Sequence, residues 1–220
     1  MRTVFWHDNH IRMIDQRRIP WVLELVDLYD TPAVAYAIYD MTVRGAPAIG
    51  ATAAFGMALA ALNSTATTSV ALLADLDTAG ELLKASRPTA VNLAWAVDRQ
   101  LKLARESEGN SPDSLRALLL TEAQRIADED VAVNMRIGAY GAELIHDGDT
   151  VLHHCNTGAL ATVDYGTALG VIRAAHEQGK RFHVLLDETR PRLQGARLSA
   201  WELEQLGVSY DIIPDTAAGV

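Results

Sequence analysis

The fold of this chain is decided by the stretch VLHHCNTGALAT, residues 151–162, which contains the only cysteine, Cys155. A short run of apolar and histidine residues predicts a strand, Asn-Thr-Gly ends it, and the periodic residues 162–178 predict a helix. Cys155 therefore falls where a strand enters a tight turn, and in an open α/β sheet small ligands bind at that end. The alternative for a lone cysteine is a buried structural role, since free cysteine is among the most buried residue types.

Strands and helices alternate from residue 150 onward, with strands expected at 151–154, 183–186 and 210–213 and helices at 162–178 and 199–206. Gly179 and Gly207 stand where helix C-terminal glycines belong. This alternation implies right-handed crossovers and a parallel sheet. The turn-forming segment HDGD, residues 146–149, separates this alternating region from the mainly helical region before it.

The sequence thus predicts an α/β protein in two parts. Residues 1–147 form a small, mainly helical domain with a few short strands, and residues 148–220 form a Rossmann-like parallel α/β domain. In the first part, apolar runs predict short strands near 4–6, 11–14 and 21–26, whose pairing stays open. Helices are expected at 31–39, from about 46, at 70–85 capped by Ser69, from 93 to 106, and from 112. The expected core face of the last one is Leu115, Leu118, Leu119, Ala123, Ile126, Val131 and Met135.

Composition excludes several classes of protein. The 220 residues carry a formal net charge of -9 and no run of Lys or Arg, which argues against binding to a nucleic-acid backbone. One cysteine allows no internal disulfide, which fits a reducing compartment. The N-terminal residues lack the apolar segment of a signal peptide, and the run 46–62 is too short and too rich in Ala and Gly for a membrane span. We expect a cytoplasmic protein that binds no membrane.

Polar residues follow each of the three predicted parallel strands. They are Cys155 and Asn156, then residues 187–190, then residues 214–216 with Asp215. A parallel sheet brings such ends to one edge, where a thiol and a carboxylate could move protons. Asp187 and Glu188 could equally be a solvated loop. Arg190, Arg192, Gln194 and Arg197 surround the second loop and could hold an anionic or hydroxylated ligand.

A second candidate site is the segment RGAP, residues 44–47, where an arginine precedes a turn and a helix start. Glycine allows close approach of the backbone, and the helix N-terminus and Arg44 could bind a phosphate. A simple helix-starting loop fits equally well. His153 and His154 share a strand, and no second cluster of His or Cys has the spacing of metal ligands, so no metal site is expected.

Five motifs occur in order along the chain: RGAPAIG at 44–50, SRPTAVN at 86–92, HCNTG at 154–158, DETRPRLQG at 187–195 and PDTAA at 214–218. Together they resemble the 5-methylthioribose 1-phosphate isomerases of methionine salvage. That family is related to the regulatory subunits of the nucleotide-exchange factor of eukaryotic translation initiation. The resemblance covers nearly the whole chain.

The resemblance implies a homodimer that isomerises a sugar phosphate without a metal or an organic cofactor. It implies that Asp215 is the proton donor and that Cys155 stabilises the transition state or shuttles the proton. The residues implied to bind substrate are Arg44, Gly45, Ala46, Arg87 and Gln194; from the residues alone, Arg87 is a solvated loop charge. The family chain continues beyond the aspartate motif with further strands and an Asn-Lys pair, so residues 148–220 are expected to be an incomplete domain.

Two alternatives stay open. One is a related isomerase of ribose 1,5-bisphosphate or 5-deoxyribose 1-phosphate, which would use the same Cys and Asp chemistry. The other is a non-catalytic regulatory subunit that binds a sugar phosphate or a nucleotide. The joint presence of Cys155 and Asp215 argues against the second, because a binding module has no need of that pair.

Overall fold

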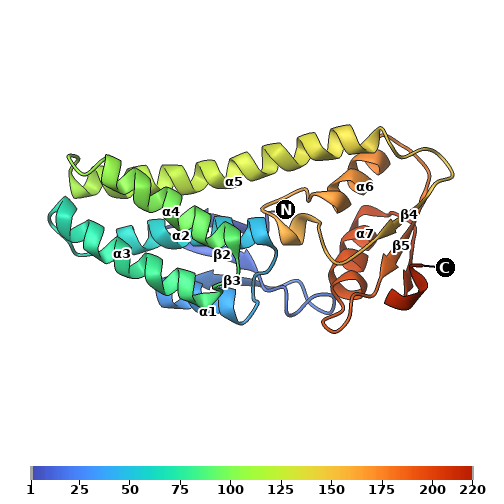
Figure 1. Cartoon of the computed structure of the whole chain (residues 1–220), viewed down its shortest axis with the longest axis horizontal. Helices are drawn as coiled ribbons and strands as arrows, with labels where there is room; N and C mark the ends of the chain where they lie inside the picture. The colour runs from blue at the N-terminus through green and yellow to red at the C-terminus, as the bar shows by residue number, and fades with distance from the viewer. Residues whose placement is uncertain (1, 220) are drawn as a thin grey trace. The chain divides into compact units, whose positions relative to one another are not determined.

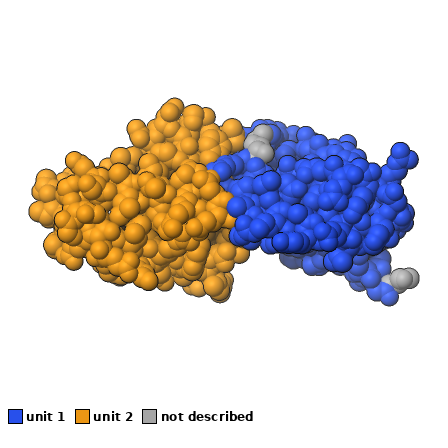
Figure 2. Space-filling view, turned by 90° about the horizontal axis from the view of Figure 1, so that it is seen from above, with its two compact units in different colours: residues 1–3, 16–24, 130–220 blue, residues 4–15, 25–129 orange. Residues whose placement is uncertain are grey.

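The structure is a computed structural model that describes residues 2–219. Its residues form two compact units, coloured separately in Figure 2. Unit 1 comprises Met1–Thr3, Gln16–Glu24 and Asp130–Val220, and unit 2 comprises Val4–Asp15 and Leu25–Glu129. Packing thus groups residues 130–147 and two N-terminal segments with the C-terminal part of the chain. The domain division at 147/148 stays a prediction, and the compact units do not follow it.

Unit 2 contains an antiparallel sheet of three strands, β1 (Val4–His7), β2 (His10–Ile14) and β3 (Leu25–Leu28), in the order β1-β2-β3. Asp8 and Asn9 form the turn of the first hairpin with φ of 42° and 65°, as a two-residue turn of this hand requires. The third strand was predicted too early, at 21–26. It begins at Leu25, and Trp21 is 74% exposed rather than packed in a sheet.

Four helices of unit 2 follow the sheet (Figure 1). They are α1 (Thr31–Tyr39), α2 (Ala46–Asn63), α3 (Ser69–Ser86) and α4 (Val91–Glu106). The start of α1 is confirmed, because the Asp30 side chain accepts a hydrogen bond from Ala33 N at 2.8 Å. The cap of α3 was predicted one residue late: Thr68, not Ser69, accepts from Ala71 N.

Helix α2 is buried along most of its length within unit 2, as its small apolar residues predicted. Among the described residues it is the one helix long and apolar enough to cross a membrane by length and composition. Of that 18-residue window, 72% is buried inside the structure, which is the property of a core helix. Gly56 brings α2 close to α1 and α3, since an added Cβ would lie 3.0 Å from Val34 Cγ1 and 3.3 Å from Leu83 Cδ1.

Helix α5 (Pro112–Ala142) contributes residues to both units, which divide between Glu129 and Asp130. The predicted core face is confirmed at Leu115 and Leu119, which are fully buried. It is wrong at Met135, which is 53% exposed. In this second half the buried face is formed instead by small or polar residues such as Asn134, Gly138 and Ala142, because they allow close packing against other parts of unit 1.

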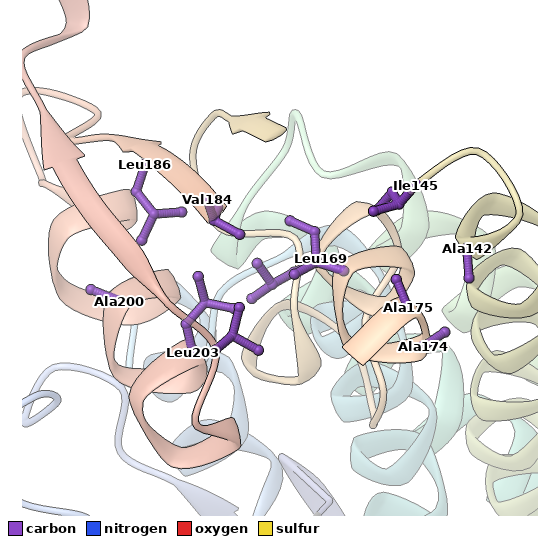
Figure 3. Packing of buried hydrophobic residues seen from close by; sticks show 11 residues of the cluster. Ala142, Ile145, Leu169, Ala174, Ala175, Val184, Leu186, Ala200 and Leu203 are labelled. Atoms are coloured by element: carbon purple, nitrogen blue, oxygen red, sulfur yellow. The ribbon is translucent and has the colours of Figure 1, made fainter. Parts of the chain in front are cut away.

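Unit 1 contains the predicted parallel sheet, with β4 (Thr150–His153), β5 (His183–Asp187) and β6 (Tyr210–Ile213) in the order β4-β5-β6. Two helices alternate with the strands, α6 (Ala168–Glu177) and α7 (Ala200–Leu206). Both cover the sheet face that carries Val184 and Leu186, and Leu169 of α6 and Leu203 of α7 join the same core (Figure 3). Gly179 and Gly207 end these helices with φ of 82° and 72°, as predicted.

The helix predicted at 162–178 begins six residues late. A single 3₁₀ turn (Ala159–Ala161) follows β4, and an irregular segment then leads to α6. Gly166 has a φ of 90°, which is incompatible with a helix at this position, so α6 begins only after it. Thr157 holds this segment in place, because its carbonyl accepts from Thr167 N at 2.7 Å and its hydroxyl accepts from Leu169 N at 2.9 Å.

Candidate active site

The three ends of the parallel strands in unit 1 meet through Thr189, which follows β5. Cys155 N donates to Thr189 Oγ1 at 2.9 Å, and Thr189 N donates to Asp215 Oδ1 at 2.7 Å. Cys155 follows β4, and Asp215 begins the short 3₁₀ helix (Asp215–Ala217) after β6. The loops expected at one edge of the sheet are therefore connected by hydrogen bonds, through the backbone amide of Cys155 and the side chain of Asp215.

Cys155 is held by its backbone in an uncommon conformation. Its φ is 67°, in the left-handed region that non-glycine residues seldom adopt. Its carbonyl accepts a hydrogen bond from Ser199 Oγ at 2.8 Å, and its amide donates to Thr189. The thiol takes no part in a disulfide, and the residue is partly accessible. A half-buried thiol on a fixed turn suits a reactive role better than a core role.

Asp215 accepts two backbone amides, from Thr189 to Oδ1 and from Arg190 to Oδ2 at 2.8 Å. These hydrogen bonds favour the charged form, and together with the charges of His154 and Arg190 they hold the pKa of Asp215 below its usual value. Without a ligand, Asp215 is therefore a carboxylate, oriented by two donors.

His154 and Asp187 form a pair beside Asp215. His154 Nδ1 lies 2.7 Å from Asp187 Oδ2, with the imidazole side chain 64% exposed and the carboxylate 6% exposed. A buried carboxylate fixes the orientation of the exposed ring in this arrangement. Among residues 2–219, His154, Asp187 and Asp215 are the group of three side chains whose candidate metal-ligand atoms all lie within 4.8 Å of one another. The expectation that the protein uses no metal stays a prediction.

The turn that carries Cys155 rests on a buried carboxylate. Glu202 of α7 accepts from Asn156 Nδ2 at 2.8 Å, from Ala159 N at 2.6 Å and from Leu160 N at 3.3 Å. Burial raises the pKa of Glu202, although these three donors oppose the shift. Gly158 is required above it, since any Cβ at that position would overlap the Glu202 carboxylate.

Gln194 lies where β5 leads into α7, directly before a π-helical turn (Gly195–Ser199). Such turns occur frequently at functional sites. The Gln194 Oε1 atom is buried and has no hydrogen-bond partner among the described residues. A hydroxyl or amide donor of a ligand would satisfy it, which favours the predicted binding role.

The other predicted substrate-binding residues belong to unit 2. Gly45 precedes α2 with a φ of 93°, so the RGAP segment is a helix-starting turn, and Ala46 is the first residue of the helix. Arg44 is the first residue of this segment, and Arg87 directly follows α3. The approach of these residues to Cys155 stays a prediction.

Sequence reasoning missed three residues that hold the site, namely Thr189, Ser199 and Glu202. Thr189 stands inside the motif DETRPRLQG and among the polar residues 187–190 that follow the second predicted strand, but the sequence pattern gives it no role of its own. Its position between a cysteine loop and an aspartate loop was the available signal. Ser199 and Glu202 had none, because each looks like an ordinary residue at the start of a helix.

Comparison with known proteins adds a family and named relatives. The model of the initiation factor 2 subunit family matches residues 42–220. A methylthioribose-1-phosphate isomerase of a Synechococcus strain is 55% identical over 219 residues, and the alignment covers 99% of this chain and 62% of the relative. The chain thus spans about 62% of the length of that curated relative.

Two solved structures agree with the fold. The 5-methylthioribose 1-phosphate isomerase of Pyrococcus horikoshii OT3 has a TM-score of 0.94 at 47% identity, covering 99% of this chain and 61% of that one. A chain described as subunit delta of translation initiation factor eIF-2B from A. fulgidus has a TM-score of 0.89 at 45% identity, covering 98% and 63%. By its sequence and its fold, the chain belongs to the initiation factor 2 subunit family.

Proposed function

We propose that the protein of this chain is an aldose-ketose isomerase that converts 5-methylthioribose 1-phosphate to 5-methylthioribulose 1-phosphate in methionine salvage. The observation that carries the proposal is the connection of Cys155 to Asp215 through Thr189. Relatives about half identical to the chain and named for this activity support it. The substrate-binding groups of the proposal are Arg44, Gly45, Ala46, Arg87 and Gln194.

The chemistry explains the need for such a site. In an aldose 1-phosphate the anomeric oxygen carries the phosphate, so the ring cannot open through a free hemiacetal. Asp215 protonates the ring oxygen as the ring opens, and Cys155 takes part in moving a proton from carbon 2 to carbon 1. The hydroxyl on carbon 2 then loses its proton and becomes the ketone, which restores the protonation state of the enzyme. Exclusion of water would strengthen the electrostatic interactions in this step.

Asp215 must hold a proton to act as a donor, although its amide contacts favour the carboxylate. A bound sugar removes water from the carboxyl group, and desolvation raises the pKa of an acid. The proposal therefore includes protonation of Asp215 in the complex with substrate.

The remaining features are proposed from the family likeness and, for location, nucleic acid and membrane, from the composition of the chain. We place the sheet of unit 1 in a Rossmann-like domain and the protein in the cytoplasm as a homodimer. Its partner is a small sugar phosphate, and it requires no metal or organic cofactor. Binding to nucleic acid or to a membrane is not part of its function.

The first test is a proton and phosphorus NMR assay with 5-methylthioribose 1-phosphate, on a chain shown to be folded by circular dichroism. Cys155→Ser and Asp215→Asn should each lower turnover by at least about a hundredfold, a range typical of proton-transfer groups, with the fold intact. Asp113→Asn is the matched control, because the Asp113 side chain is 94% exposed in unit 2. Near-normal rates in either site variant would contradict the assigned roles.

The same assay separates the alternatives. Conversion of ribose 1,5-bisphosphate or 5-deoxyribose 1-phosphate in preference to the methylthio sugar would assign the related isomerase. Tight binding of a sugar phosphate without turnover, in this chain and in a chain of the relatives' full length, would favour a regulatory subunit. Turnover in the longer chain alone would show that the active protein needs residues beyond these 220.

A further inference from the structure

Thr189 is the one residue that hydrogen-bonds to both Cys155 and Asp215 among the interactions described for unit 1. Its hydroxyl accepts from Cys155 N at 2.9 Å and donates to Asp187 O at 3.1 Å, while its own amide donates to Asp215 Oδ1 at 2.7 Å. The residue is 7% exposed. The hydroxyl and the amide of Thr189 thus both form hydrogen bonds. The partners are Cys155, which follows β4, Asp187, which ends β5, and Asp215, which follows β6.

The backbone of Thr189 supports a functional assignment. Its φ is 59°, which is an outlier for a β-branched residue. Such a conformation is unfavourable and persists only where the surroundings enforce it. Cys155 has a φ of 67°, so two non-glycine residues in left-handed conformation are joined by one hydrogen bond. Strain of this kind clusters at active sites.

The hydrogen bond from Cys155 N to Thr189 Oγ1 also satisfies a backbone amide that the sheet leaves without an acceptor. Strand β4 ends at His153, so the ladder of the sheet ends before Cys155 and its amide needs another acceptor. Thr189 Oγ1 is that acceptor, and Ser199 Oγ binds the Cys155 carbonyl from the other side. Serine at 199 fixes the turn, whereas threonine at 189 also fixes it relative to Asp215.

We infer that Thr189 is a positioning residue, which holds the Cys155 thiol and the Asp215 carboxylate in register for proton transfer. The inference rests on the proposed isomerase function. A shift of about 1 Å at a reacting group can cost a hundredfold in rate, so a single hydroxyl that sets this register has a large effect.

The test uses Thr189→Val, which keeps the branched shape and the amide but removes the hydroxyl. Thr189→Ser restores the hydroxyl. We expect Thr189→Val to lower kcat at least about tenfold with little change in KM, and Thr189→Ser to recover kcat to within about threefold of the unaltered protein, since a positioning role acts on the reaction step rather than on ground-state binding.

A second readout does not depend on isomerase activity. Cys155 is the only cysteine, so the rate of alkylation by iodoacetamide as a function of pH reports its surroundings directly. Thr189→Val should shift this profile and Thr189→Ser should restore it. Thr52→Val is the control, because Thr52 is a buried threonine of α2 in unit 2 whose hydroxyl binds Ala48 O at 2.7 Å. It should cost stability without changing alkylation.

The outcomes separate the two proposals. An alkylation profile that changes in Thr189→Val and recovers in Thr189→Ser supports the positioning role even if no sugar phosphate is isomerised. Turnover and alkylation that are both unchanged in folded Thr189→Val would overturn it. If Thr189→Val does not fold, failure of Thr189→Ser to retain the normal profile and kcat would equally overturn it.

Discussion

His153 is a buried imidazole at the end of β4, only 5% exposed. Its Nε2 lies 2.9 Å from Thr157 Oγ1, while Nδ1 is buried with no hydrogen-bond partner among the described residues. Protonation would leave an N–H donor buried without an acceptor. Burial, followed by the neighbouring charge of His154, accordingly lowers the pKa of His153 to about 4.

Stability should therefore fall in acid through this residue. Between its unfolded pKa of 6.5 and its folded pKa of about 4, the unfolded chain binds a proton that the folded chain does not. The free energy of unfolding decreases as pH falls through that window, by about 3 kcal/mol in total. Urea unfolding at pH 7, 5.5 and 4 should show this loss, and His153→Gln should lack it. Equal losses in both proteins would contradict the assignment.

The packing of α5 against α6 depends on two glycines of α5, Gly138 and Gly141. A Cβ added to Gly138 of α5 would lie 2.7 Å from the Tyr165 ring and 3.0 Å from the Gly170 carbonyl oxygen. A Cβ added to Gly141 would overlap the side chain of Val171. The glycines allow the two helices to approach with backbone near backbone, which explains why the buried face of α5 carries so few large residues after Asp130.

Gly138→Ala should be destabilising, although alanine is the better helix former by about 1 kcal/mol. We expect a net loss of about 1–3 kcal/mol, the usual cost of overpacking, because the Gly170 backbone cannot move aside like a flexible side chain. The urea midpoint measures it. Gly109→Ala serves as control, since no heavy atom lies within 4 Å of the added Cβ. An unchanged midpoint in Gly138→Ala would show that α5 and α6 are less tightly packed than described.

The net charge of the whole chain is negative, which bears on whether it binds nucleic acid. Its 28 acidic residues exceed its 19 basic ones, and no basic run offers a local exception. Binding to a nucleic-acid backbone depends on Lys and Arg that neutralise phosphates, so the net charge of -9 opposes it.

Fluorescence anisotropy with a labelled DNA duplex and a labelled single-stranded RNA should show no saturable binding at 0.15 M salt. A basic DNA-binding domain of known affinity, titrated in parallel, is the positive control. Saturable binding that weakens as salt rises would contradict the expectation.

Much of the fold could be predicted because it depends on local pattern. Asp30 and Pro32 fixed the start of α1, glycines fixed the ends of α6 and α7, and the alternation after residue 150 gave the parallel sheet. The errors arose where tertiary contacts override periodicity. Met135 fits the helical pattern of a core residue, yet the buried face of α5 runs through Asn134, Gly138 and Ala142 and leaves Met135 53% exposed.

The sequence by itself determined the order of elements, the parallel sheet and the loops that carry Cys155, Asp215 and Gln194, because these depend on the spacing of apolar residues and on turn-forming residues nearby in the chain. Only the tertiary structure decided what holds those loops. Thr189 joins the Cys155 and Asp215 loops. Glu202 supports the Cys155 turn by accepting a hydrogen bond from Asn156, which lies 46 residues away in the sequence. Such contacts depend on how strands and helices come together, which no local pattern encodes.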